Sequence, residues 1–145
     1  MAVSIPALSI RQPWAELIIS GRKTVEVRSW ITEYRGKLWV HAGKTSNSEL
    51  ENTFGLHDLF KGGYIGSVQL SATVPLDSER WELWRERHLD SAGYVPGQFG
   101  WILERPIRFH APIPGPGSLS LFQPARDIEQ LLHDAEEKAM DYPRT

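Results

Sequence analysis

The chain has 145 residues, of which 41% are hydrophobic and 23% charged, and its net charge is −2. These proportions are typical of one soluble globular domain and exclude a disordered or fibrous chain. Because the sequence contains no cysteine, disulfides, thiolate metal sites and a cysteine nucleophile are excluded. No apolar run approaches the roughly 20 residues of a membrane-spanning helix, and no secretory signal is visible. We therefore expect a cytoplasmic protein.

Charge is distributed unevenly along the chain. Residues 1–46 contain seven basic and three acidic side chains, whereas the rest of the sequence is net acidic. A locally basic segment indicates an anionic partner for that segment, and an unevenly charged solvated surface is the alternative. The isoelectric point of about 6.2 argues against indiscriminate binding to duplex DNA.

The first predicted element is a short helix over residues 13–20. Pro13 suits the first helical turn, where a missing N–H group costs nothing. Trp14, Leu17 and Ile18 follow at helical spacing and form one apolar stripe. We expect this helix to pack against the rest of the domain through that stripe.

Two strands are predicted next. Residues 24–28 alternate polar and apolar types, so Val25 and Val27 should face the core while the opposite face carries Thr24, Glu26 and Arg28. A second strand over residues 37–41 should place Leu38 and Val40 on one face and Trp39 and His41 on the other.

The remaining elements follow from the same kinds of pattern. Residues 47–60 are consistent with a helix capped by Asn47 or Ser48. The expected order after it is a β-rich run over 64–76, a helix over 79–89, a strand over 99–109, a loop over 112–117 and an acidic amphipathic helix over 125–139. Pro106 interrupts the strand and must lie at an edge or a bulge.

Short strands with peripheral helices favour a mainly β (α+β) fold, a small β-barrel with helical additions. We expect one domain over residues 1–145, with its core over about 8–122 and an acidic helix and tail over 123–145. The sequence has no Gly-x-Gly-x-x-Gly or Walker-type motif, so no nucleotide cofactor is expected.

The five histidines are scattered through the chain. No two of them lie two or four residues apart, so we expect no metal site. His57, His88 and His133 fall beside charged residues in predicted helices and should face solvent. A Gly-x-Ser-x-Gly nucleophile elbow is also missing from the sequence.

Four stretches taken together resemble a known family. They are residues 8–15, 21–30, 34–42 and 100–106, and the second contains a Gly-x-Lys-x-x-Glu-x-Arg signature formed by Gly21, Lys23, Glu26 and Arg28. This order closely resembles the ASCH domain, a branch of the PUA-like superfamily, over about residues 8–122. The resemblance implies a PUA-like β-barrel with a cleft beside the first helix that holds RNA or a nucleoside-like ligand. A monomer is the default oligomeric state.

The basic residues of the signature have two interpretations. Lys23, Arg28 and Arg35 could converge on an anion while Glu26 orients one of them. Alternatively, Glu26 and Arg28 form a surface ion pair of little energetic worth. Arg11 suits phosphate or base edges, and the same segment could instead cap the helix.

Three further residues complete the candidate set. Gln12 offers an amide next to Arg11. Trp39 is a core candidate that could instead be a base-stacking platform, like Trp30 and Trp101. His41 is interpreted as a hydrogen-bonded structural histidine, with a catalytic base as the alternative.

An enzyme is the alternative function. Some ASCH-like proteins are amidohydrolases acting on N4-acetylcytidine, in which a lysine acts on a threonine nucleophile with a remote glutamate, and others are described as ribonucleases. Lys23 matches that lysine, but Glu26 occupies the place of the threonine, and Thr24 lies two residues earlier. Glu26 could activate water as a general base instead. The remote glutamate stays open among Glu82, Glu86 and Glu104.

Overall fold

The protein folds around one six-stranded sheet, seen in a computed structural model that describes residues 4–141. Its strands are β1 Ala7–Gln12, β2 Val25–Arg28, β3 Gly36–Ser46, β4 Gly63–Pro75, β5 Phe99–Pro114 and β6 Leu121–Phe122. Its helices are α1 Trp14–Ile19, α2 Ser48–Thr53, α3 Ser78–Leu83, α4 Arg85–His88 and α5 Arg126–Asp141. The mainly β class predicted from the sequence is confirmed.

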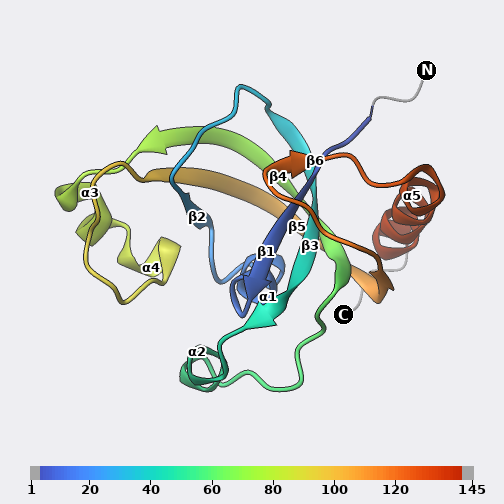
Figure 1. Cartoon of the computed structure of the whole chain (residues 1–145), viewed down its shortest axis with the longest axis horizontal. Helices are drawn as coiled ribbons and strands as arrows, with labels where there is room; N and C mark the ends of the chain where they lie inside the picture. Colours follow the sequence, from blue (N-terminus) through green and yellow to red (C-terminus); the bar gives the residue numbers. More distant parts are fainter. Residues whose placement is uncertain (1–3, 142–145) are drawn as a thin grey trace.

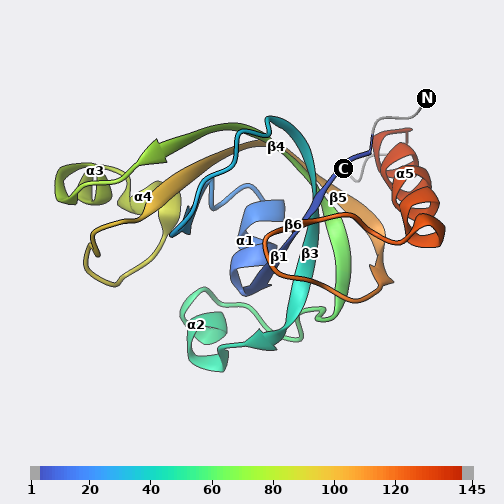
Figure 2. The same ribbon diagram turned by 45° about the horizontal axis from the view of Figure 1, so that its top comes forward.

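The sheet has the strand order β2-β5-β4-β3-β1-β6 and curls into a half-barrel. Its neighbouring strands are antiparallel except for the parallel pair of β1 and β3. The long strands β4 and β5 arch over α1, which lies inside the concave side (Figures 1 and 2). Helices α3 and α4 lie at one end of the molecule and α5 at the other.

Strand β3 separates two apolar cores, as its alternation predicts. Leu38 and Val40 belong to the concave core, which α1 completes with Ala15, Ile18 and Ile19. Trp39, on the opposite face, packs with Leu132 of α5 in the second core. Because both faces of the sheet are covered, β3 has buried side chains on both sides.

Two predicted helices are confirmed with small shifts of boundary, whereas the helix expected over 47–60 is present only over Ser48–Thr53. Helix α1 begins one residue after Pro13, and the helix expected over 125–139 is α5. Helix α2 is capped by Asn47, whose side chain accepts from the Leu50 N–H at 3.1 Å. The pairing of β4 with β5 shifts between Ser67–Ile107 and Gln69–Glu104, so Pro106 lies in a bulge as expected.

Other predictions were wrong in part. The sequence did not indicate β1 or β6, and β5 continues to Pro114 through the first half of the expected loop. The helix expected over 79–89 is split at Trp84 into α3 and α4. No helix among residues 4–141 combines the length and the apolar character that crossing a membrane requires.

Candidate functional site

A polar pocket of about 470 Å³ lies where the half-barrel stays open, between β1 and β2. Its charged walls come from Arg11, Lys23, Glu26, Arg28 and Asp90, and its aromatic walls from Trp14 and Trp30. Ser9, Val27, Ser29 and Gln98 complete the lining. We refer to this cavity as the seam pocket.

The seam pocket exists because two strand edges approach each other without pairing. Within residues 4–141, β6 pairs with β1 only at Ala7 and Leu8, which leaves the β1 edge open from Ser9 onward. The Arg28 Nη2 group on β2 donates to the Ser9 carbonyl oxygen at 3.2 Å. One arginine side chain thus bridges the seam where a ladder of backbone hydrogen bonds would otherwise close the barrel.

Glu26 contacts two of the cations that line the pocket, Arg28 and Lys23. Its carboxylate accepts from Arg28 Nε at 3.2 Å and from Arg28 Nη2 at 2.9 Å. The Lys23 Nζ atom lies 3.7 Å from its other oxygen. Glu26 itself is 6% exposed, so the face of β2 opposite Val25 is not a solvent face, and the surface ion pair considered above is a largely buried one.

Lys23 is the most buried cation of the site, with 3% of its surface exposed. It follows the turn at Gly21, where φ is +85°, a conformation suited to glycine. Its ammonium group donates to the His88 carbonyl oxygen and lies 4.6 Å from the ring centroid of Trp14. Burial lowers the pKa of Lys23, while the charges of Glu26 and Asp90 act against that shift.

The aromatic walls are fixed by packing. The Trp30 ring meets Trp101 edge to face, with 4.7 Å between centroids, and the Trp101 indole N–H donates to the Trp30 carbonyl oxygen at 3.1 Å. The Trp14 ring meets Phe54 edge to face at 5.8 Å. Both tryptophans pack on the concave core while one part of each lines the pocket.

The structure leaves four of the proposed ligand-binding residues outside the seam pocket. Gln12 donates to the Phe60 carbonyl and accepts from the Glu16 N–H, so it anchors the start of α1. Trp39 is fully buried in the core under α5. His41, also buried, contacts the Ser9 hydroxyl and the Gly115 carbonyl. Arg35 is exposed and bonds to Thr32, Tyr34 and Thr73.

Two residues of the site escaped the sequence analysis. Asp90 lines the pocket, whereas none of Glu82, Glu86 and Glu104 does. His88, expected in solvent, is fully buried and presents its backbone carbonyl to Lys23. His88 lies seven residues after Trp81, a spacing that puts both on one helix face, but the charged neighbours of His88 were weighed above that spacing.

The arrangement is suited to a ligand with both hydrogen-bond donors and acceptors. Three cations and two carboxylates surround the same cavity, and aromatic surface lies beside them. A buried amine next to a carboxylate could also serve in proton transfer. Among residues 4–141, no group of three or more His, Cys, Asp or Glu side chains is placed to hold a metal ion.

Comparison with known families identifies an ASCH domain in the chain. The ASCH domain family model matches residues 8–113, and the chain belongs to this family. The chain is also similar to activating signal cointegrator 1 from Mus musculus, at 29% identity over 142 residues, and from Homo sapiens, at 28%. Each match covers 92% of this chain but only 24% of the relative, so the chain spans about a quarter of those proteins.

Solved structures of the family share the fold. ASCH from Zymomonas mobilis superposes with a TM-score of 0.67 at 18% identity, covering 90% of this chain and 94% of that one. A serine-to-alanine mutant of the same Zymomonas mobilis protein superposes with a TM-score of 0.64 at 19% identity, covering 90% and 95%. At 18% and 19% identity, these superpositions show that the two proteins share a backbone fold.

Proposed function

We propose that the protein binds RNA or a modified nucleoside, with one nucleoside unit held in the seam pocket. The observation that carries this proposal is the convergence of Arg11, Lys23 and Arg28 with two tryptophan rings around one cavity. Its volume of about 470 Å³ lies within the range of about 300–1,000 Å³ typical of small-molecule sites. Aromatic surface beside cationic groups is a common platform for single-stranded bases.

The charge balance favours a base or nucleoside over a polyphosphate. Glu26 and Asp90 offset two of the three cations, so the pocket carries an excess of one positive charge. A nucleobase edge presents both donors and acceptors and can use both kinds of side chain. Arg11, which is exposed, and Arg28 are the two cations that we expect to contact phosphates of a longer strand.

A salt titration separates a polymer from a free nucleoside. If Arg11 and Arg28 contact phosphates of single-stranded RNA, log affinity should fall against log salt with a slope of about −1.4. Raising salt about fourfold would then weaken binding about sevenfold. A neutral nucleoside should bind with almost no salt dependence. Absence of binding by both ligands at low salt would contradict the proposal.

Two exposed arginines provide a matched pair of variants. Arg11→Ala removes a cation that lines the pocket and should reduce the slope by about 0.7. Arg35→Ala removes a cation that the structure places outside it, and should leave the slope unchanged. Equal losses in the two variants would indicate binding to a general basic surface.

Hydrolysis of an N4-acylated cytidine is the second candidate. The supporting observation is Lys23, a buried amine of lowered pKa that lies 3.7 Å from the Glu26 carboxylate in the pocket wall. Thr24 does not line the pocket, so water activated by Glu26 or Asp90 would be the nucleophile. Incubation with acylated and unmodified nucleosides tests this: turnover lost in Lys23→Ala supports an enzyme, and no turnover leaves binding.

A further inference from the structure

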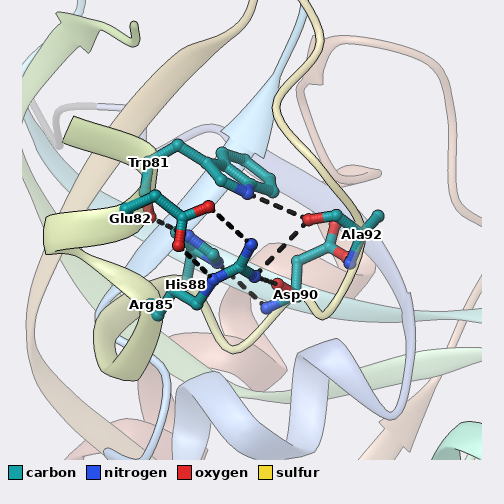
Figure 3. Close-up of polar contacts among 6 residues, drawn as sticks. All are labelled: Trp81, Glu82, Arg85, His88, Asp90 and Ala92. Atoms are coloured by element: carbon teal, nitrogen blue, oxygen red, sulfur yellow. Dashed lines mark hydrogen bonds and ion pairs between the residues drawn. The ribbon is translucent and has the colours of Figure 1, made fainter. Parts of the chain in front are cut away.

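A tight corner at the end of α4 contributes Asp90 to the lining of the seam pocket. The corner consists of His88, Leu89 and Asp90, and Figure 3 shows His88 and Asp90 beside Trp81 and Arg85. Leu89 has the left-handed conformation, with φ 62° and ψ 12°. The reversal of the chain directs the His88 carbonyl oxygen to Lys23 and brings Asp90 to the pocket lining.

The buried ring of His88 stabilises the inner side of this corner by stacking and by two hydrogen bonds. The ring stacks on the Trp81 indole, with 4.0 Å between centroids and 24° between planes. Its Nε2 atom lies 2.8 Å from the Trp81 carbonyl oxygen, and its Nδ1 atom lies 3.0 Å from the backbone nitrogen of Asp90. A carbonyl only accepts and an amide N–H only donates, so these contacts require a neutral ring with its proton on Nε2.

Hydrogen bonds also hold the outer side of the corner. The Arg85 guanidinium donates to the Asp90 carbonyl oxygen at 2.9 Å and pairs with both oxygens of Glu82 at 2.8 Å. The Asp90 carboxylate accepts from the Ala92 N–H at 2.9 Å, and the Ala92 carbonyl accepts from the Trp81 indole N–H at 2.9 Å. The two hydrogen bonds of the His88 ring join the backbone of Asp90 in the corner to the backbone of Trp81 in α3 (Figure 3).

We propose that His88 is a positioning residue for the seam pocket: its neutral Nε2–H ring fixes the corner that supplies the carbonyl partner of Lys23 and presents Asp90 to the ligand. The part that concerns Asp90 rests on the proposed function. The part that concerns Lys23 does not, because it can be tested without a ligand.

Protonation of the ring would release the corner. A proton on Nδ1 would face the Asp90 N–H, so two donors would oppose each other. The charged groups around the ring are Lys23 and Arg85, which disfavour a second cation, and Asp90 and Glu82, which favour it. Burial lowers the pKa of His88, so the ring stays neutral near neutral pH.

The first test uses the unmodified protein. Nitrogen-15 NMR of the imidazole rings at about pH 7 should show the neutral Nε2–H form for His88. The Asp90 amide should be protected from hydrogen exchange and lose that protection as pH falls and the ring titrates. A charged ring or the Nδ1–H form at neutral pH would overturn the proposal.

The second test measures the reactivity of Lys23 without ligand. A small acylating reagent is applied, and modification of Lys23 is compared with that of the exposed Lys44 by mass spectrometry. His88→Phe retains an aromatic ring for stacking on Trp81 but removes both hydrogen bonds. It should raise the ratio of Lys23 to Lys44 modification about tenfold by opening the corner. The exposed-histidine control His57→Phe should leave the ratio unchanged.

The outcomes are distinguishable. A folded His88→Phe protein with an unchanged ratio would overturn the proposal, and if this variant does not fold, the NMR test of the unmodified protein decides. Asp90→Asn should weaken nucleoside binding while leaving the corner closed, because the amide retains the acceptor for Ala92, so the backbone amide at position 90 should stay protected from hydrogen exchange. A changed ratio in His88→Phe, together with no RNA or nucleoside binding by the unmodified protein, would refute the proposed function and leave the positioning role standing.

Discussion

Among residues 4–141, a glutamate is buried against a lysine at three places, one of which is the pair of Glu51 in α2 with Lys61. The other two lie on opposite faces of the sheet, and the one at the seam opens to a pocket. On the concave side, Glu26 accepts from Arg28 and lies 3.7 Å from Lys23 at the seam. On the other side, Glu136 of α5 accepts from the Ser67 hydroxyl at 2.5 Å and pairs with Lys37. The glutamates are buried alike, at 6% and 7% exposure.

The lysines differ between the two regions. The Lys37 side chain is 33% exposed, so its charge reaches water, whereas that of Lys23 is 2% exposed. Glu136 attaches α5 to β3 and β4, and this is a sufficient reason for its burial. Lys23 and Glu26 attach no helix of comparable length, yet they line a cavity. Burial of both partners beside open space, more than the ion pair itself, therefore distinguishes the candidate site from the contact between α5 and the sheet.

Removal of Glu26 should have the largest effect on stability. Glu26→Ala leaves the Lys23 ammonium buried without its nearest counter-charge, and breaking such a pair typically costs about 3–5 kcal/mol. We expect a loss of about 3 kcal/mol because the His88 carbonyl still accepts from Lys23. Urea denaturation followed by tryptophan fluorescence measures the change. A loss of less than about 1 kcal/mol in the free energy of unfolding would contradict this prediction, because it would mean that Lys23 does not need Glu26 as a counter-charge.

Removal of Glu136 should cost less. In Glu136→Ala the Lys37 charge remains solvated, and the main loss is the hydrogen bond from the buried Ser67 hydroxyl, about 1–2 kcal/mol. The same urea titration applies. RNA or nucleoside affinity should stay unchanged, because Glu136 is not among the residues that line the seam pocket. An effect as large as that of Glu26→Ala would remove the distinction between the two regions.

Acid should destabilise both regions through their buried histidines. Burial lowers the pKa of His41 and of His88 below the ordinary value of 6.5. Below about pH 6.5 the unfolded chain therefore binds protons that the folded chain does not, so stability is lost as pH falls through this window. Midpoints of urea denaturation measured across that pH range test whether stability falls toward acid. His88→Phe and His41→Phe should each flatten the dependence, whereas a midpoint that rises toward acid would contradict it.

Replacement of Lys23 should have the smallest effect on stability. Lys23→Met keeps much of the volume, and Glu26 keeps Arg28 as a partner, so the free energy of unfolding should change by no more than about 1 kcal/mol. Ligand affinity should nevertheless fall, because the ammonium group is lost from the pocket wall. Calorimetric titration with a nucleoside, beside urea denaturation, separates the two effects. A stability loss equal to that of Glu26→Ala would contradict this prediction.

The local elements and the family could be predicted from the amino-acid sequence. Helix α1, the two faces of β3, the bulge at Pro106 and helix α5 follow from periodicity and from the fixed φ of proline, which depend only on neighbouring residues. The four stretches that resemble an ASCH domain are likewise read directly from the chain, and the family match confirms them.

Which side chains share the pocket depends on the tertiary structure. Arg35 and Arg28 belong to the same basic segment, yet the turn into β3 leaves Arg35 on the outside, bonded to Thr73. Asp90 and His88 lie 65 or more positions from Lys23 and reach it only because the sheet curls and α4 ends in a left-handed corner. Periodicity predicts the face of a strand or helix on which a residue lies. It does not predict which distant segment the curled sheet brings next to that face.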